Sequence, residues 1–87
     1  MVVSGFDWDE NNVFHIERHQ FTPEEVEEVF AGDHKVRRIG QKRYMALGET
    51  LDCRLAFVVF RRLSHGSIRV VTARDMEDRE RRLFRRK

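Results

Sequence analysis

Hydrophobic positions in the first third of the chain recur every three or four residues, which is the spacing of one buried face of a helix. Asp9 provides the N-cap of a helix over residues 10–19. A second helix starts at Pro23, because Thr22 is a good N-cap and Glu25 completes a capping box. The positions predicted to face the core are Val13, Ile16, Val26, Val29 and Phe30.

After residue 33 the pattern changes to that of β-strands. The predicted strands are 35–39, 43–48, 54–60 and 68–73. The first is basic, which suits an exposed edge, and the third is apolar on both alternating sets of positions, which is typical of a central strand covered on both faces. Short loops join the strands, so they should pair antiparallel. Phe6 and Trp8 flank Asp7 and fit either a short additional strand or an anchoring lead-in.

A highly charged helix follows, beginning near Met76 with Asp75 as its N-cap. Its acidic residues lie mostly in the first turn and its basic residues in segment 81–87, as the helix dipole favours. Met76, Leu83 and Phe84 form one narrow apolar stripe. The sequence therefore predicts an α+β fold with two N-terminal helices, an antiparallel four-stranded sheet that a short N-terminal strand can extend, and a C-terminal helix packed on the sheet.

The length of 87 residues fits a single domain, 1–87. A domain this small gains from the surface that a dimer or a partner buries, so a homodimer is one open oligomeric state. The chain has no apolar run long enough to cross a bilayer and no signal-peptide pattern, so we expect a cytoplasmic protein without a membrane span. The lone Cys53 excludes an internal disulfide and fits a reducing compartment.

The charges are segregated along the chain. Residues 1–34 hold nine acidic residues against Arg18 alone, a balance of 1 − 9 = −8. From Lys35 onward sixteen Lys or Arg stand against six Asp or Glu, a balance of 16 − 6 = +10, and the two parts sum to the formal net charge of +2. A basic surface of this density favours RNA, DNA or an acidic protein as the partner. The alternative is a surface whose two halves neutralise one another across the fold.

His15 and His19 are one helical turn apart, which is a spacing of metal ligands, and His34 and His65 are the other two histidines. The glutamate of the zincin pattern and a cysteine pair are both missing from the sequence, so no metal site and no cofactor are predicted. Two roles stay open for the pair. One role is structural, because a protonated imidazole is favoured near the C-terminal end of the first helix. The other is hydrogen bonding or acid–base catalysis at a functional site.

Four arginines lie in or at the ends of the last two predicted strands: Arg61, Arg62, Arg69 and Arg74. Since these strands should be neighbours, several guanidinium groups can lie on one side of the sheet. There they can bind phosphates through bidentate hydrogen bonds. Strand alternation places Arg69 and Arg74 on opposite faces. We therefore expect at least one of these two side chains to be solvated or salt-bridged.

Arg43 and Tyr44 on the adjoining strand can add a cation and a stacking surface for RNA, although Tyr44 also fits a core position with a wet hydroxyl. A ribonuclease without a metal must activate a ribose 2′-hydroxyl, stabilise charge on the phosphate and protonate the leaving oxygen. Arginines suit the second of these tasks. His19, His15 or Glu80 would serve the first and third, and the residues alone do not decide among them.

Several segments, taken in order, resemble the BrnT family of bacterial toxins: 6–10, 15–19, 22–29, 43–48, 68–76 and 79–82. The resemblance implies a RelE-like α+β fold and a type II toxin that cleaves RNA and inhibits translation. It also implies neutralisation by a small BrnA-type antitoxin whose complex binds its own operator, so that operator DNA is reached only through the antitoxin complex. For this chain, the family implies a metal-independent ribonuclease with an acidic or ribbon-helix-helix partner.

The resemblance also points to particular residues. It favours Arg74 and, at the end of the long central strand, Arg62 as functional residues, and it matches His15 and His19 to histidines of one branch of the family. These four residues make up the predicted catalytic set. The residues predicted to bind RNA are Arg43, Tyr44, Arg61 and Arg69.

The sequence departs from the family pattern at two places. Gln20 stands where glycine usually follows the histidine, and acidic residues at 77–78 replace more basic ones before Arg79. The second change lowers the positive charge at the start of the last helix. The alternative function, from a different class, is a non-catalytic module that binds nucleic acid or protein through a basic sheet face.

Overall fold

The computed structural model describes residues 1–86, which form three α-helices and five β-strands. The helices are α1 (Glu10–Glu17), α2 (Pro23–Ala31) and α3 (Asp78–Arg85). The strands are β1 (Gly5–Phe6), β2 (His34–Gly40), β3 (Arg43–Glu49), β4 (Leu55–Arg62) and β5 (Ser67–Asp75). Lys87, the last residue of the predicted basic segment, lies outside the described residues. The predicted α+β class is confirmed.

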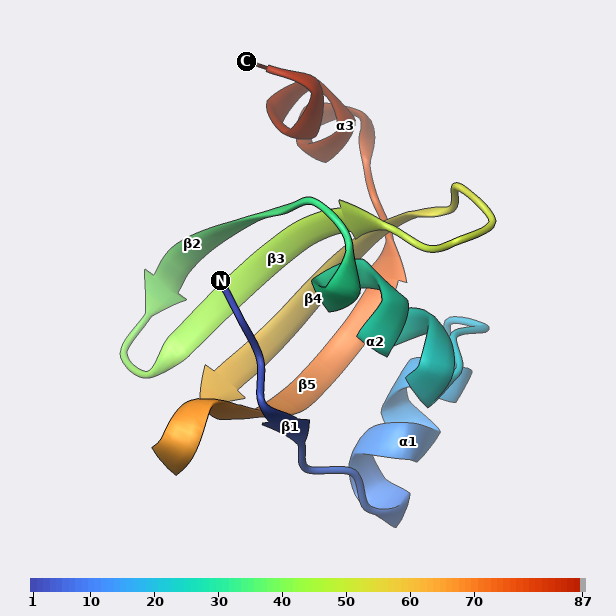
Figure 1. The fold of residues 1–87 in the computed structure, drawn as a ribbon. Helices are drawn as coiled ribbons and strands as arrows, with labels where there is room; N and C mark the ends of the chain where they lie inside the picture. The colour runs from blue at the N-terminus through green and yellow to red at the C-terminus, as the bar shows by residue number, and fades with distance from the viewer. Residues whose placement is uncertain (87) are drawn as a thin grey trace.

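The strands form one sheet in the order β1-β5-β4-β3-β2 (Figure 1). Strands β2 to β5 are antiparallel neighbours, as predicted, with the basic β2 at the edge and the apolar β4 in the middle. The sheet has five strands rather than four, because Gly5 and Phe6 pair in parallel with Ser67 and Ile68 of β5. A strand of two residues is too short for alternation to distinguish it from a lead-in.

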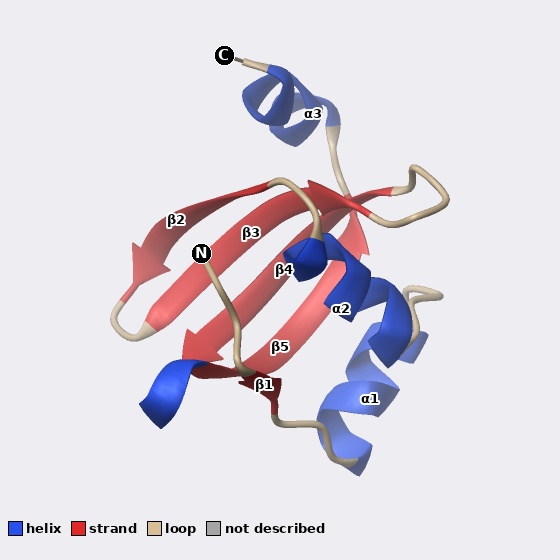
Figure 2. Cartoon of the chain, in the orientation of Figure 1, coloured by secondary structure: helices blue, strands red, loops and turns tan. Residues whose placement is uncertain are grey.

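Helices α1 and α2 cover one face of the sheet, which we call the helix-covered face (Figure 2). α1 packs on β5, and α2 packs on β3 and β4. The side chains buried between the helices and the sheet include Ile16, Phe21, Val26, Val29, Phe60, Ile68 and Val70. This layer forms the main hydrophobic core and fixes the direction in which every strand residue points.

We call the opposite side of the sheet the open face. Met45 and Leu47 alternate along β3 with Ala46, which faces the helices, and so they point to the open face. α3 packs over them at one end of the sheet. The apolar cluster beneath α3 contains Met45, Leu47, Leu55, Phe57, Met76, Leu83 and Phe84. The predicted contact of Leu83 and Phe84 with the sheet is thus confirmed, whereas Met76 joins the cluster from the segment before α3, which begins at Asp78 and not near Met76.

Capping decides where two of the helices begin. Thr22 Oγ1 accepts from the Glu25 amide at 3.2 Å, and Glu25 Oε1 accepts from the Thr22 amide at 2.9 Å, so the predicted start of α2 is confirmed. The predicted N-cap of α3 is wrong. Asp75 is the last residue of β5 and its carboxylate binds Arg54, whereas Glu77 is the N-cap of α3.

α1 is fastened to β5 by a buried asparagine. Asp9 caps the helix as predicted, and the helix ends at Glu17, two residues before the predicted end. Asn12, which is 2% exposed, completes the capping box by accepting from the Asp9 amide at 2.8 Å. Its Nδ2 atom donates to the carbonyl oxygens of Asp7 at 2.8 Å and Val70 at 3.0 Å. One side chain therefore joins the start of α1 to the strand beneath it.

Replacing Asn12 by alanine is expected to cost about 1–3 kcal/mol of unfolding free energy, because the buried carbonyl of Val70 loses its side-chain donor and the α1 cap loses one acceptor. Urea unfolding followed by circular dichroism measures this change. Asn11→Ala is the matched control, since Asn11 is the exposed neighbour in the same turn. Equal unfolding midpoints for the two variants would show that Asn12 does not carry this connection.

Candidate functional site

A β-bulge in β5 decides which way its arginines face. The register leaves Val71 unpaired; on one side of it Arg69 pairs with Arg61, and on the other Arg74 pairs with Phe57. Directly opposite residues share a face, and positions 57 and 61 lie on the same side of β4, so both arginines of β5 lie on the open face. The prediction that they point to opposite sides is wrong, because one inserted residue reverses the alternation.

Arg74 lies at the end of the open face that adjoins α3. Its guanidinium carbon is 4.1 Å from the centroid of the Phe57 ring. Its Nη1 and Nη2 atoms donate to Oε1 and Oε2 of Glu80, each at 2.8 Å, and Nη1 also donates to the carbonyl oxygen of Asp75 at 3.0 Å. The side chains of Arg74 and Glu80 are 30% and 14% exposed, so solvent still reaches the arginine.

The pairing keeps both partners charged. The hydrogen bond with Glu80 raises the pKa of Arg74 above its ordinary value. Burial by itself would raise the pKa of Glu80, but the hydrogen bonds from Arg74 and the Glu77 amide outweigh it and hold that pKa below its ordinary value. Glu80 is therefore ionised at neutral pH and is unsuited to donate a proton to a leaving oxygen.

The far end of the open face is basic. A shallow depression there is lined by Gln41, Lys42, Arg43 and Arg61. Nη1 and Nη2 of Arg69, which pairs opposite Arg61, lie 3.2 Å and 2.9 Å from carboxylate oxygens of Asp7 and Asp9, so the expected salt-bridging of at least one β5 arginine is confirmed. We call Lys42, Arg43, Arg61 and Arg69 the basic end. Arg61 lies four residues along β4 from Phe57, the residue opposite Arg74. The basic end is therefore about 13 Å from Arg74.

Arg62 and Tyr44 lie on the other side of the sheet. The Arg62 guanidinium is 4.7 Å from the Tyr44 ring centroid, and Tyr44 stacks on Phe60 with 5.7 Å between ring centroids. Phe60 belongs to the core beneath α1 and α2, so this group is on the helix-covered face. Within the predicted set, the structure brings Arg43, Arg61, Arg69 and Arg74 to one face and separates Arg62 and Tyr44 from them.

Both candidate histidines are exposed. His15 lies in α1, and His19 lies just after that helix, where its carbonyl oxygen accepts from Arg54 Nη2 at 2.9 Å. Arg54 binds both this carbonyl oxygen and the Asp75 carboxylate, so the turn that carries His19 lies beside the end of β5. Within residues 1–86, no hydrogen bond or ion pair joins either imidazole to Arg74.

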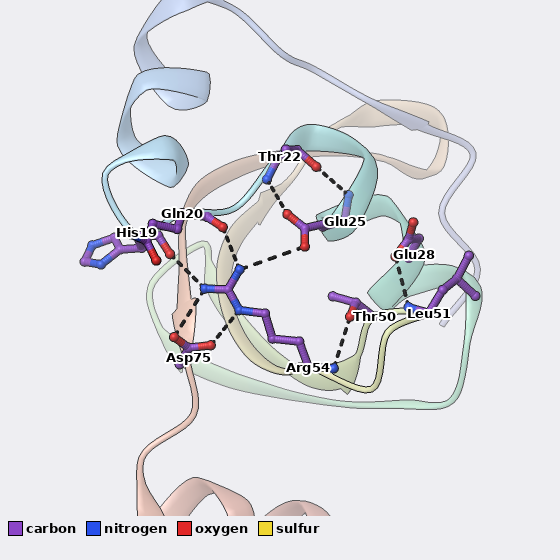
Figure 3. A network of polar contacts seen from close by, with 9 residues as sticks. All are labelled: His19, Gln20, Thr22, Glu25, Glu28, Thr50, Leu51, Arg54 and Asp75. Atoms are coloured by element: carbon purple, nitrogen blue, oxygen red, sulfur yellow. Dashed lines mark hydrogen bonds and ion pairs between the residues drawn. The ribbon is translucent and has the colours of Figure 1, made fainter.

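Arg54 joins the end of α1 to the end of β5, as Figure 3 shows. Its Nε atom donates to Asp75 Oδ1 at 2.7 Å and its Nη2 atom to Oδ2 at 3.2 Å. Its Nη1 atom donates to the carbonyl oxygen of Gln20 at 2.6 Å, and its guanidinium lies 3.6 Å from the centroid of the Phe21 ring. This side chain fixes the turn that carries His19 against the strand end next to Arg74.

From the sequence, Arg54 is expected only to begin the central strand, and its bridging role is not apparent there. The one local signal is a charged residue at the head of an otherwise apolar run. Its partners lie 21 to 35 positions away in the chain, and no periodicity brings them together. Glu25 of α2 adds a further carboxylate at 3.9 Å from Nη1.

The Arg54–Asp75 pair makes stability depend on pH. The hydrogen bond from Arg54 lowers the pKa of Asp75 below its ordinary value of 3.8. The ionised Asp75 carboxylate therefore adds to the unfolding free energy at pH values above the unfolded-state pKa. This added stability is lost as the pH falls through the folded-state pKa. We expect the unfolding free energy to fall between about pH 5 and about pH 3. Urea titrations across this range measure the slope, and Arg54→Ala should flatten it. An unchanged slope in that variant would contradict the linkage.

Two further properties limit the kinds of site. The described part of the chain, residues 1–86, holds no group of three or more His, Cys, Asp or Glu side chains placed to bind a metal ion. Over the same residues, no helix has the length and apolar character needed to span a bilayer. The candidate site on the open face is therefore built from the basic end and from Arg74 with its Phe57 and Glu80 contacts. His15 and His19 belong to α1 and the turn after it, which lie on the helix-covered side of the sheet.

The fold and this surface define a small α+β protein with an arginine-rich open sheet face suited to a polyanion. A family model described as "Ribonuclease toxin, BrnT, of type II toxin-antitoxin system" matches residues 8–80, and the chain belongs to this BrnT toxin family. No curated protein matches the chain. Membership of a family of type II ribonuclease toxins implies an RNA substrate and an antitoxin partner.

Proposed function

We propose that this chain is a metal-independent endoribonuclease that cleaves RNA and inhibits translation. The observation that carries the proposal is the position of Arg74. Its guanidinium stacks on Phe57 at one end of the open face, and the other end of that face is basic. A guanidinium held in a partly shielded position can stabilise the charge that builds on a phosphate during cleavage. The family membership supports ribonuclease chemistry.

In this proposal the RNA backbone lies along the open face. The basic end binds phosphates, and Arg74, about 13 Å away, contacts the phosphate that is cleaved. His19 is the favoured proton-transfer group because Arg54 holds the turn that carries it beside the end of β5, next to Arg74. His15, on the preceding helical turn, is the second candidate. Arg62 and Tyr44 on the helix-covered face would contact RNA only where it passes around the sheet edge.

The partners follow from the same proposal. A BrnA-type antitoxin neutralises the chain, operator DNA is bound only by the toxin–antitoxin complex, and the protein acts in the cytoplasm. We further propose that the fold is RelE-like and that a homodimer forms. The open face is the surface that we expect the antitoxin to cover, because its positive charge suits an acidic partner.

The direct test is induction of the chain in bacteria, with growth and RNA integrity followed over time. Growth arrest with RNA decay is expected, and co-expression of a short partner gene adjacent to the toxin gene should relieve it. Purified protein should cleave RNA equally well with and without a chelator. Cleavage that requires an added divalent cation would contradict the metal-independent mechanism.

A non-catalytic binding module is the second candidate function. Two observations favour it: carboxylates already pair with Arg69 and Arg74, and neither imidazole is bonded to Arg74 within residues 1–86. Such a module would bind RNA with a steep salt dependence and leave it intact. Binding measured at several salt concentrations, together with gel analysis of the recovered RNA, separates the two functions.

A further inference from the structure

The guanidinium of Arg74 has two edges that can bind an anion. The end edge, formed by Nη1 and Nη2, is taken by the two carboxylate oxygens of Glu80 at 2.8 Å each. Nη1 uses its other hydrogen for the carbonyl oxygen of Asp75 at 3.0 Å. The side edge consists of Nε–H and the second hydrogen of Nη2. Within residues 1–86, no protein acceptor binds this side edge.

The contacts around Arg74 fix the direction of the side edge. The Phe57 ring supports one flat side of the guanidinium at 4.1 Å. Glu80 is itself held at the start of α3, because its Oε1 atom also accepts from the Glu77 amide at 2.8 Å. The Arg74 side chain nevertheless keeps 30% of its surface exposed. The unpaired edge is therefore held in one direction, on a side chain that solvent still reaches.

We propose that Glu80 is a positioning residue that holds the end edge of Arg74 and so presents the Nε–Nη2 edge to a phosphate of the substrate. The proposal rests on the function proposed above and specifies how its phosphate is recognised. Two parallel N–H groups match two phosphate oxygens, which is the geometry that lysine cannot supply. Because the edge is fixed before the substrate arrives, little rotational freedom is lost on binding.

The same contacts argue against Glu80 as the general base. Oε1 accepts from Arg74 and from the Glu77 amide, and Oε2 accepts from Arg74, so both carboxylate oxygens are engaged. The neighbouring positive charge also lowers the basicity of this carboxylate, in agreement with the direction of its pKa shift. Glu80 acts through Arg74 and does not touch the reacting atoms.

The test compares Glu80→Gln with Glu77→Gln. Glutamine at position 80 keeps one oxygen for the Glu77 amide but turns an amide NH2 toward Arg74, so the two-point contact is lost while the helix cap is kept. Glu77→Gln removes the same charge from the same helix start, and Glu77 makes no hydrogen bond to Arg74. Thermal unfolding of both variants checks that they are folded.

The probe is a fluorescent RNA oligonucleotide methylated at every 2′-oxygen, which binds but cannot be cleaved. We expect Glu80→Gln to weaken its binding by about ten-fold or more and Glu77→Gln to change it by less than about two-fold. In a nuclear magnetic resonance titration, the Nε–H signal of Arg74 should shift with RNA in the unmodified protein. This shift should be lost in Glu80→Gln, an effect that a merely stabilising role of Glu80 would not produce.

Three results would overturn the proposal. Tighter binding by Glu80→Gln would mean that Glu80 competes with phosphate for Arg74. Unchanged binding with loss of cleavage would make Glu80 a proton-transfer group, and an Nε–H signal insensitive to bound RNA would place the phosphate elsewhere. If the unmodified protein binds RNA without cleaving it, the proposed function fails, but the comparison of the two variants still decides whether Glu80 positions Arg74.

Discussion

Replacing Arg74 by alanine is expected to lower the rate of RNA cleavage by at least about 100-fold, because one preorganised donor to a developing phosphate charge contributes about that much. The guanidinium has its Phe57 and Glu80 contacts in place before substrate arrives, so its loss removes both charge and geometry. Cleavage of a defined RNA under single-turnover conditions measures the effect. Growth arrest on induction should disappear in the same variant.

Two further variants make this result specific. Arg82→Ala removes an exposed arginine from α3 and should leave cleavage within about two-fold of the unmodified protein. Arg74→Lys keeps the positive charge but loses the planar guanidinium, which can bind Glu80 and a phosphate along different edges. Its cleavage rate should therefore be closer to that of the alanine variant than to that of the unmodified protein. Equal growth arrest by Arg74→Ala and by the unmodified chain would remove Arg74 from the mechanism.

Arg54→Ala should be the most destabilising of the arginine substitutions, with a loss of about 2–3 kcal/mol of unfolding free energy. The carbonyl oxygens of His19 and Gln20 and the carboxylate of Asp75 all lose their charged donor, and Phe21 loses the group that covers its ring. For a domain of this size, the corresponding fall in Tm is about 10–20 °C. Thermal and urea unfolding measure it.

Arg69→Ala is the matched control for this experiment. The Arg69 and Arg54 side chains are 27% and 25% exposed, and both bind carboxylates. The partners of Arg69 are, however, two half-exposed aspartates with no backbone carbonyl among them, so its loss should cost at most about 1 kcal/mol. Similar losses of stability in the two variants would show that Arg54 contributes only a surface ion pair.

Local signals predicted much of the fold. The Thr22–Glu25 capping box, the Asp9 cap and the apolar positions of α2 depend on residues within one or two turns of each other, and the structure confirms them. The antiparallel order of β2 to β5 followed from short connections, and the central position of β4 from its continuous apolar run. In each case the determining residues are neighbours in the sequence.

The errors share a different physical origin. The bulge at Val71 inserts one residue without changing composition, and it reverses the side on which every later residue of β5 points. Asp75 has the side chain of a good N-cap, but Arg54, 21 positions earlier, binds it in the strand. The strand register and the Arg54–Asp75 contact both join segments that are distant in the chain, so patterns read along the sequence do not reveal them. The gathering of Arg61, Arg69 and Arg74 on one face likewise depends on the sheet register, which no local pattern specifies.

The pairing of β1 with β5 also has a consequence during protein synthesis. Residues 5–6 emerge early from the ribosome, but their partners at 67–68 are made only after the three intervening strands. Pairings between segments so far apart form late, because a long loop must close first. Arg74 lies on the same last strand as those partners. A nascent chain therefore carries no assembled open face around Arg74 until β5 has been made.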